Sequence, residues 1–260
     1  MKFFLPKPFL SRLMRAITEF DMISSGDRIL IGLSGGKDSL FLTFALACLR
    51  DIMPHKVQLH VLTIDPQFTD TFDPGPLTTF CADLDIPFAL RKADIAGIIA
   101  ANQGKDPCFT CAFFRRGAMN RYAREIGCNK IAYAHHHDDA VETFLMGQLY
   151  AGQLKTFLPV TPLSRTGLTV IRPLIYFRER ELKESIALHG QAPLDSPCPL
   201  NGKTKRQEIK EIIAAWEQIN PSFYTHLASA MRSGTSVELW PPIPEREELH
   251  SRHRTFWQLP

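Results

Sequence analysis

The fold is decided by one stretch near the amino terminus, Arg28-Ile29-Leu30-Ile31-Gly32-Leu33-Ser34-Gly35-Gly36-Lys37-Asp38-Ser39. Residues 28–33 form a short apolar run, which is typical of a buried parallel strand. A glycine pair follows this run, and the pattern over residues 38–50 is helical. A strand that passes through a glycine turn into a helix is where open α/β sheets bind phosphate groups.

Strand and helix patterns alternate beyond this stretch. Strand-like apolar runs cover residues 57–65, 86–90, 130–134 and 168–175. Helical patterns cover residues 10–20, 77–84, 95–101, 112–126, 139–150 and 178–189, and then residues 205–218 and 221–231. The alternation predicts the α/β fold class, a doubly wound, Rossmann-like parallel sheet with carboxy-terminal helices.

We expect four parts along the chain. They are a lead-in helix in residues 1–24, an α/β domain in residues 25–190, a helical segment carrying Cys198 in residues 191–233, and a tail in residues 234–260. The tail is expected to be irregular because Trp240-Pro241-Pro242 and Pro244 interrupt regular structure.

Composition narrows the function classes. The 260 residues are 45% hydrophobic, which is enough for a large core. Pro6 and Pro8 cut the first apolar stretch, and the run at residues 40–49 is about half of the ~20 residues that span a bilayer. We therefore expect a cytoplasmic protein without a membrane partner. The net charge of +3 indicates no nucleic-acid binding by bulk charge, so any such contact needs a local patch.

The loop at residues 34–39 is built to hold phosphate. Its glycines let the backbone approach an anion closely, and the helix amino terminus offers unpaired N–H groups. The side chains of Ser34, Lys37 and Ser39 add donors. The loop is not a Walker A motif, since Asp38 stands where that motif has Ser or Thr. An ordinary glycine turn capped by serine is the alternative.

The six cysteines are too thinly spread for a disulfide scaffold. Cys108 and Cys111 are separated by two residues at the beginning of a predicted helix, which favours thiolates. This spacing alone leaves a redox dithiol, half a zinc site or part of an iron–sulfur cluster open. Cys198, between two prolines, is a third rigidly presented thiol. Three thiolates without a fourth suit a [4Fe–4S] cluster with one open iron. The other three are expected in the core: Cys48, Cys81 and Cys128.

Several motifs resemble, in the same order, those of the tRNA 2-thiocytidine synthetase family of the PP-loop ATP pyrophosphatases. They are Ser34-Gly35-Gly36-Lys37-Asp38-Ser39, residues 108–117, Ala134-His135-His136-His137-Asp138-Asp139, Ile171-Arg172-Pro173-Leu174, Arg178-Glu179, Pro197-Cys198 and residues 228–231. The resemblance covers about residues 25–233. It departs at Ala134, where the family has Gly, and at Asn201, where the family often has a second Cys.

The resemblance implies an ATP- and iron–sulfur-dependent enzyme that adenylates the C2 oxygen of a cytidine in the tRNA anticodon loop and replaces it with sulfur. It implies three cofactors, which are ATP, Mg²⁺ and a [4Fe–4S] cluster held by Cys108, Cys111 and Cys198. The implied nucleotide-binding residues are Ser34, Gly35, Gly36, Lys37, Asp38, Ser39, Asp65, His135 and Asp138, and the implied catalytic residues are Asp38, Arg115 and Asp139.

Arg115, four residues after Cys111, would stabilise negative charge on the base oxygen or the α-phosphate. For the aspartates a purely structural explanation stays open as well. Asp138 and Asp139 are expected to cap the next helix, one of them facing the nucleotide or Mg²⁺, but a pure helix cap stays open. Asp65 is expected beside the nucleotide, with a turn before Pro66 as the alternative.

The implied partners are tRNA and a sulfur donor such as a cysteine desulfurase. A homodimer is a further expectation. Two basic groups flank the thiols and would contact RNA unless they are simply solvated: Arg115, Arg116, Arg121 and Arg124, and Lys203, Lys205, Arg206 and Lys210. Two other functions stay open. One is an enzyme that delivers an amine, as in lysidine synthetase, and the other is a non-enzymatic iron–sulfur sensor that binds nucleotide.

Overall fold

The computed structural model describes residues 3–54, 56–69, 71–195, 197–200, 202, 204–232 and 245–258. Its strands form one six-stranded sheet in the order β3-β2-β1-β4-β6-β5. The strands are β1(Arg28–Gly32), β2(Gln58–Asp65), β3(Phe88–Lys92), β4(Lys130–Ala132), β5(Val160–Leu163) and β6(Leu168–Ile171). All neighbours pair in parallel except β5 and β6. The predicted α/β class with a doubly wound sheet is confirmed.

The helices follow the predicted order, with small shifts at their ends. They are α1(Lys7–Glu19), α2(Lys37–Ile52), α3(Gly75–Asp83), α4(Ile95–Ala101), α5(Pro107–Glu125), α6(His137–Ala151), α7(Glu179–Glu184), α8(Ile186–His189), α9(Lys205–Ile219), α10(Phe223–Ala230) and α11(Arg246–Gln258). Helix α5 begins five residues before the predicted start, because Pro107 suits the first position of a helix. None of the helices in the described part of the chain is long and apolar enough to cross a membrane.

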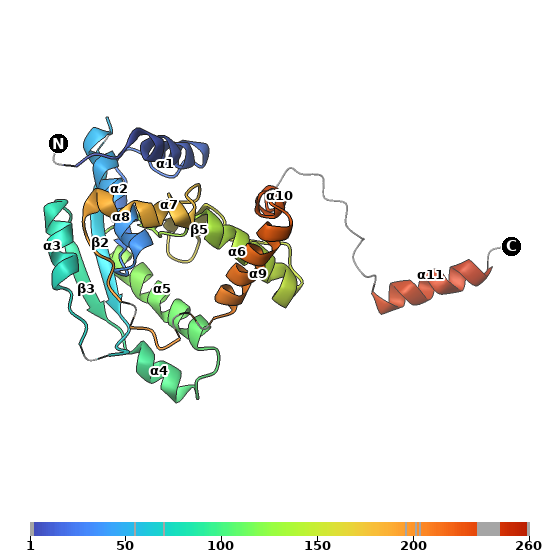
Figure 1. Ribbon diagram of the computed structural model, residues 1–260. Coiled ribbons are helices and arrows are strands. Elements are labelled where there is room, and N and C mark those ends of the chain that lie inside the picture. Colours follow the sequence, from blue (N-terminus) through green and yellow to red (C-terminus); the bar gives the residue numbers. More distant parts are fainter. Residues whose placement is uncertain are drawn as a thin grey trace.

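Three elements differ from the prediction. Strand β5 was missed, and it lies at the sheet edge, where Pro162 is tolerated despite its missing N–H. The helix predicted at residues 178–189 is two helices, which meet at Ser185. The tail was expected to be irregular, but residues 246–258 form α11, which lies apart from the α/β body (Figure 1). The last of the prolines on which that prediction rested is Pro244, and α11 begins after it. The segment from 233 to 244 lies outside the described residues.

The sheet is covered on both faces because its strands alternate. In β1, Ile29 and Ile31 join the core under α1, α2, α3 and α7, whereas Leu30 points to the other face and joins the core under α4 and α5. This alternation is the period-two pattern of a strand that is buried on both sides. Figure 1 shows α5 crossing the sheet on the face opposite to α2.

Helices α9 and α10 pack against α6 rather than against the sheet (Figure 1). Val141 and Leu145 of α6 form a third apolar cluster with Ile209, Ile213 and Tyr224. The chain that leads to α9 also contacts the loop after β1, since the Leu194 N–H donates to the Gly35 carbonyl at 2.9 Å. The carboxy-terminal segment is therefore tied to both α6 and the phosphate loop.

Strands β2 and β3 lie on one side of β1, and β4, β6 and β5 lie on its other side, so the strand order reverses between β1 and β4. At such a switch point the loops after the two strands separate and leave a crevice at the carboxyl edge of the sheet. The loop at residues 34–39 follows β1, and residues 133–136 follow β4. The two most motif-rich loops of the sequence therefore meet at one crevice.

Asp27 should stabilise the two strands that carry these loops. Its carboxylate contacts the Lys130 ammonium at 2.6 Å, the Asn129 amide at 2.7 Å and the Ser24 N–H at 2.6 Å. We expect Asp27→Ala to lower the free energy of unfolding by about 3 kcal/mol, because it leaves a largely buried lysine without its partner. Urea denaturation measures this loss, and Asp51→Ala, which removes an exposed carboxylate, is the control. Equal effects of the two variants would contradict the prediction.

Candidate active site

Hydrogen bonds of the Ser39 hydroxyl fix the shape of the phosphate loop. The Ser39 hydroxyl accepts from the Ser34 N–H at 3.1 Å and donates to the Gly36 carbonyl at 2.9 Å. Gly36 is the N-cap of α2, and no side chain caps that helix. The first N–H groups of α2 are therefore left without a side-chain acceptor, as a phosphate-binding helix terminus requires.

Gly35 is required by both conformation and space. Its φ is +83°, and a Cβ at this position would lie 3.2 Å from the Leu194 side chain. The predicted glycine requirement therefore has two sources, a backbone shape that other residues rarely adopt and a close approach by the segment that precedes Cys198.

Lys37 is held by two carboxylates. Its ammonium lies 3.1 Å from Asp38 Oδ2 and 3.1 Å from Glu179 Oε1. Burial alone would lower the pKa of Lys37, but the two carboxylates outweigh it and raise the pKa. The second carboxylate oxygen of Asp38, Oδ1, is buried and has no hydrogen-bond partner. This oxygen fits a cation, because a desolvated anionic oxygen otherwise has nothing to offset its burial.

Glu179 bridges two lysines. Its second oxygen contacts the Lys210 ammonium of α9 at 2.9 Å. Burial would raise the pKa of Glu179, but the hydrogen bond from Lys210 and the charge of Lys37 lower it to about 2. Glu179 was quoted as part of a motif in the sequence, but its role was missed. Its partners lie far away in sequence, and no local signal identifies them.

The three histidines after β4 have different partners. His136 is buried and forms a capping box with Asp139 at the start of α6. The His137 ring contacts the Tyr224 hydroxyl at 2.6 Å. His135 packs against Tyr133 and Phe157, and its Nδ1 is buried without a partner. Burial lowers the pKa of His135 to about 4, so its ring is neutral at pH 7.

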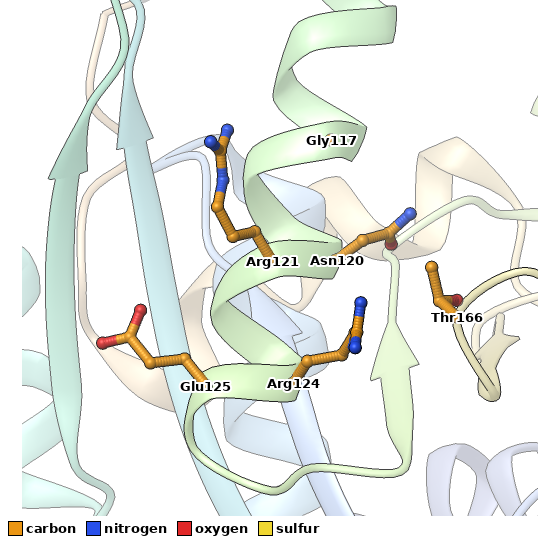
Figure 2. Close-up of a pocket in the computed structure, with 6 residues that line it drawn as sticks. All are labelled: Gly117, Asn120, Arg121, Arg124, Glu125 and Thr166. Atoms are coloured by element: carbon orange, nitrogen blue, oxygen red, sulfur yellow. The ribbon is translucent and has the colours of Figure 1, made fainter.

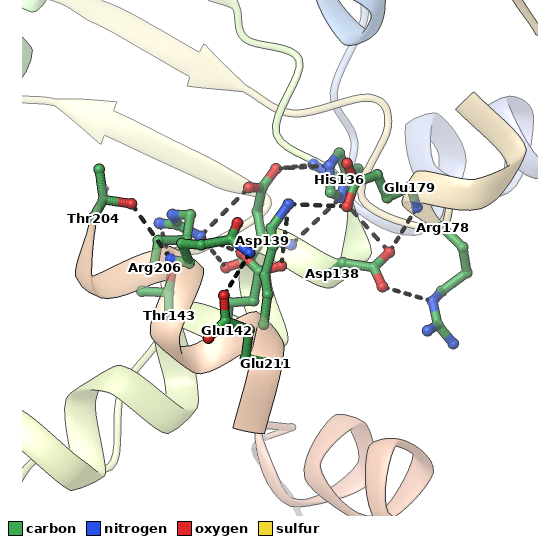
Figure 3. A network of polar contacts seen from close by, with 12 residues as sticks. His136, Asp138, Asp139, Glu142, Thr143, Arg178, Glu179, Thr204, Arg206 and Glu211 are labelled. Carbon is green, nitrogen blue, oxygen red and sulfur yellow. Dashed lines mark hydrogen bonds and ion pairs between the residues drawn. The ribbon is translucent and has the colours of Figure 1, made fainter. Parts of the chain in front are cut away.

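Both carboxylates that follow these histidines are occupied by the protein (Figure 3). Asp138 accepts from the Arg178 guanidinium at 2.9 Å and from the Glu179 N–H at 2.8 Å, so it caps α7 rather than α6. Asp139 accepts from the His136 N–H at 2.9 Å and lies 3.4 Å from Arg206. The helix-cap alternative therefore describes Asp139, and Asp138 joins two segments.

Next to these caps, α6 and α9 are joined by an ion pair between the buried Glu142 and the partly exposed Arg206. The Arg206 guanidinium lies 2.9 Å from Glu142, which is 3% exposed, and donates to the Asp139 carbonyl at 3.2 Å (Figure 3). Arg206 was predicted to contact RNA or solvent, and the structure instead gives it these protein partners. Lys203 of the same predicted group lies outside the described residues, as does Asn201.

Asp65 lies at the end of β2 and is buried. Its Oδ1 accepts from the Gln67 N–H at 2.9 Å, which closes a turn after Pro66. The turn alternative therefore accounts for one carboxylate oxygen of Asp65.

The three predicted ligand thiols come from two segments of the chain. Cys108 and Cys111 lie in the first two turns of α5, and Cys198 lies on the segment that follows Leu194. Burial raises the pKa of Cys111, Arg115 lowers it by charge and a hydrogen bond, and Cys198 and Cys108 raise it. Across the described ranges, no three His, Cys, Asp or Glu side chains are gathered closely enough to hold a metal ion.

The donor set nevertheless fits an iron–sulfur cluster, because it offers three thiols and no hard oxygen ligand. Cys108 is exposed and Cys111 and Cys198 are partly exposed, so all three can be reached from outside. Cys48, Cys81 and Cys128 are buried as predicted. Burial raises the pKa of Cys81 to about 12, which makes that thiol inert.

Gly35→Ala should weaken ATP binding about tenfold, because the loop must leave its positive φ and move from Leu194. Calorimetric titration with ATP measures the dissociation constant. Gly36→Ala is the matched control, since Gly36 has a φ of −74° and its nearest new contact would be Ser34 Oγ at 3.5 Å. An equal or larger loss in Gly36→Ala would contradict this role of Gly35.

Glu179→Gln should lower the free energy of unfolding by about 2 kcal/mol at pH 7, because two lysines lose their shared carboxylate. The folded-state pKa of about 2 lies below the ordinary 4.5, so this stabilisation is complete above pH 4.5 and is lost as the pH falls to about 2. Urea denaturation at pH 7 and pH 3 should show the difference from wild type shrinking. Glu184→Gln, at an exposed position of α7, should match wild type at both values. A pH-independent deficit would exclude the bridge.

Comparisons with known proteins agree with this geometry. The model of the PP-loop domain family matches residues 9–214. The tRNA-cytidine(32) 2-sulfurtransferase of Nitrosomonas europaea is 34% identical over 226 residues, which cover 84% of this chain and 70% of that protein. The protein of the same name from Cellvibrio japonicus is 34% identical over 223 residues, which cover 84% of this chain and 73% of that protein.

A solved structure supports the fold. The U34-tRNA thiolase NcsA from Methanococcus maripaludis, solved with its [4Fe-4S] cluster, has a TM-score of 0.69 at 20% identity, over 86% of this chain and 78% of that one. The family resemblance drawn from the motifs is thus confirmed by sequence matches over most of the chain. This chain belongs to the PP-loop family, together with the tRNA-cytidine(32) 2-sulfurtransferases.

Proposed function

We propose that this chain is an ATP- and iron–sulfur-dependent tRNA sulfurtransferase that replaces the C2 oxygen of an anticodon-loop cytidine with sulfur. One observation carries the proposal, the hydrogen bond of 2.9 Å from the Leu194 N–H to the Gly35 carbonyl. Cys198 is four residues beyond Leu194, so its Cα lies within about 14 Å of that bond. This contact supports assigning the phosphate loop and Cys198 to one site.

The reaction has two displacements. In the first, the C2 oxygen bonds to the α-phosphorus of ATP and the bond to pyrophosphate breaks. In the second, sulfur bonds to C2 and the oxygen leaves with AMP. Adenylation is needed because an unactivated base oxygen is a poor leaving group.

The residues after β1 are assigned to ATP. The N–H groups of the loop, with Lys37 and the hydroxyls of Ser34 and Ser39, would hold the pyrophosphate. Asp38 Oδ1, buried and unpartnered, is the oxygen that we assign to Mg²⁺. The neutral His135, with its unpartnered Nδ1, would contact the nucleotide. Asp65 stays a predicted neighbour of the nucleotide.

Asp138 and Asp139 are assigned a positioning role. Through Arg178, the Glu179 N–H and the capping box of α6, they hold the loop after β4 against α7. Mg²⁺ binding by either carboxylate would require breaking these contacts, so Asp38 is the better ligand.

The residues at the start of α5 are assigned to sulfur transfer. Cys108, Cys111 and Cys198 would hold the [4Fe–4S] cluster, which when bound offers an open iron for sulfur. Arg115 lies one helical turn after Cys111 and lowers the pKa of that thiol by its charge, so we assign its guanidinium to stabilising negative charge on the base oxygen or the α-phosphate. A cysteine desulfurase as sulfur donor, a homodimer and a cytoplasmic location also belong to this proposal.

Alanine substitution of any one of Cys108, Cys111 and Cys198 should abolish 2-thiocytidine formation and remove cluster iron. The measurements are iron and sulfide content after anaerobic purification, and nucleoside analysis of tRNA from a deletion strain carrying each variant. Cys128→Ala is the control, because that thiol is 5% exposed and lies in the core. Unchanged 2-thiocytidine in the deletion strain itself would reject the substrate.

The same variants separate the two other functions. If Cys108→Ala keeps ATP-dependent activity on its substrate, an amine-delivering enzyme is favoured. If the wild-type protein binds ATP but releases no pyrophosphate in the presence of tRNA, a nucleotide-binding sensor is favoured.

A further inference from the structure

Helix α5 has a second face that the proposed chemistry does not use. We call it the outer stripe, and it consists of Phe109, Phe113, Arg116, Gly117, Asn120, Arg121 and Arg124. Successive members are one to four residues apart and fall on one side of the helix. The side turned to the sheet carries Ala118, Met119, Tyr122 and Ala123, which pack in the core. Apart from the half-buried Asn120, the outer stripe is exposed to solvent along its length of about 22 Å.

The end of the outer stripe near the thiols is aromatic. Phe109 is 67% exposed and Phe113 is 57% exposed. Their rings lie 6.3 Å apart and 23° from parallel, and Phe114 adds an edge contact to Phe113 at 5.4 Å. Large apolar side chains grouped on a surface indicate a binding site. Exposed ring faces of this kind are platforms on which unpaired nucleic-acid bases stack.

The other end of the outer stripe is cationic. Arg121 and Arg124 line a hollow of about 570 Å³ with Gly117, Asn120, Glu125 and Thr166 (Figure 2). Glu125 is already bonded to Arg91 at 3.0 Å. Among the described residues, neither Arg121 nor Arg124 nor Arg116 has an acidic partner. The hollow therefore presents unneutralised positive charge to a ligand.

Gly117 lies between these two ends, inside the helix. A glycine there destabilises a helix by roughly 1 kcal/mol relative to alanine. Packing does not require it, because a Cβ on Gly117 would have no atom within 4 Å. A missing side chain in open space between aromatic and cationic groups lets a ligand backbone lie close against the helix.

We propose that the outer stripe of α5 binds the substrate RNA, with unpaired bases stacked on Phe109 and Phe113 and flanking phosphates held by Arg116, Arg121 and Arg124. This inference rests on the proposed function, since it takes the substrate to be an RNA loop. Exposed rings that are followed along the helix by arginines without acidic partners match the bases and phosphates of a single strand. RNA that follows the outer stripe arrives at the helix end that carries Cys108 and Cys111.

Three variants test the proposal by fluorescence anisotropy with a labelled tRNA transcript, without ATP. Phe113→Ala should weaken binding about tenfold through the loss of one stacked base. Arg124→Gln should weaken binding and reduce the slope of log affinity against log salt by about one. Gly117→Ala should weaken binding although its melting temperature is at or above that of wild type, a combination that a purely structural role does not give.

Two controls match these changes elsewhere on the surface. Phe4→Ala removes a phenylalanine that is 73% exposed near α1, and Arg180→Gln removes an exposed arginine of α7. Both should bind the transcript as wild type does.

The proposal is overturned if the three outer-stripe variants bind the transcript and thiolate it as wild type does. It is also overturned if they keep their RNA affinity but change self-association in sedimentation, which would make the outer stripe an interface between copies of the chain. Failure of the proposed function looks different: the wild-type protein would form no 2-thiocytidine, while RNA binding would still respond to the outer-stripe variants.

Discussion

The arrangement of the crevice depends on the carboxylate of Glu179, which lies between Lys37 and Lys210. Lys37 belongs to the phosphate loop and Lys210 to α9, so this one group joins two segments that are far apart in sequence. The Glu179 N–H is in turn held by Asp138 at the start of α6. Helices α2, α6, α7 and α9 therefore converge on a single ion-paired residue, and the bridge keeps Lys37 charged and positioned before any phosphate arrives.

The link between phosphate and sulfur chemistry is made by backbone rather than by charge. The Leu194 N–H binds the Gly35 carbonyl, and the Leu194 side chain fills the space that a Cβ of Gly35 would need. A displacement of the Gly35 backbone is therefore expected to move the segment that carries Cys198. Helix α5 carries Cys111 and Arg115 on one side, and on the other side Phe109 and Phe113 are exposed to solvent.

Local patterns predicted most of the fold. The β1 run, the glycine loop and α2 were assigned correctly because their signals, apolar runs and helix periodicity, lie within a few residues. Strand β5 was missed because a short edge strand with a proline carries little pattern of its own. Helix α11 was missed because the helix-breaking effect of Pro241, Pro242 and Pro244 was assumed for all of residues 234–260. The site was predicted in its residue types, whereas the partners of Asp138 and Arg206 were not.

The sequence by itself determined the α/β class and the burial of Cys48, Cys81 and Cys128, since both follow from hydrophobic pattern. It predicted the phosphate loop and the three ligand thiols by residue type and spacing. Only the tertiary structure decided which of Asp38, Asp138 and Asp139 has a buried carboxylate oxygen without a protein partner. Asp138 and Asp139 are bound by Arg178 and Arg206, whereas Asp38 keeps one oxygen unpartnered. The physical reason is that an ion pair joins residues brought together by packing. Asp138 and Arg178 are 40 positions apart, and Glu142 and Arg206 are 64 apart, distances at which the sequence carries no periodic signal.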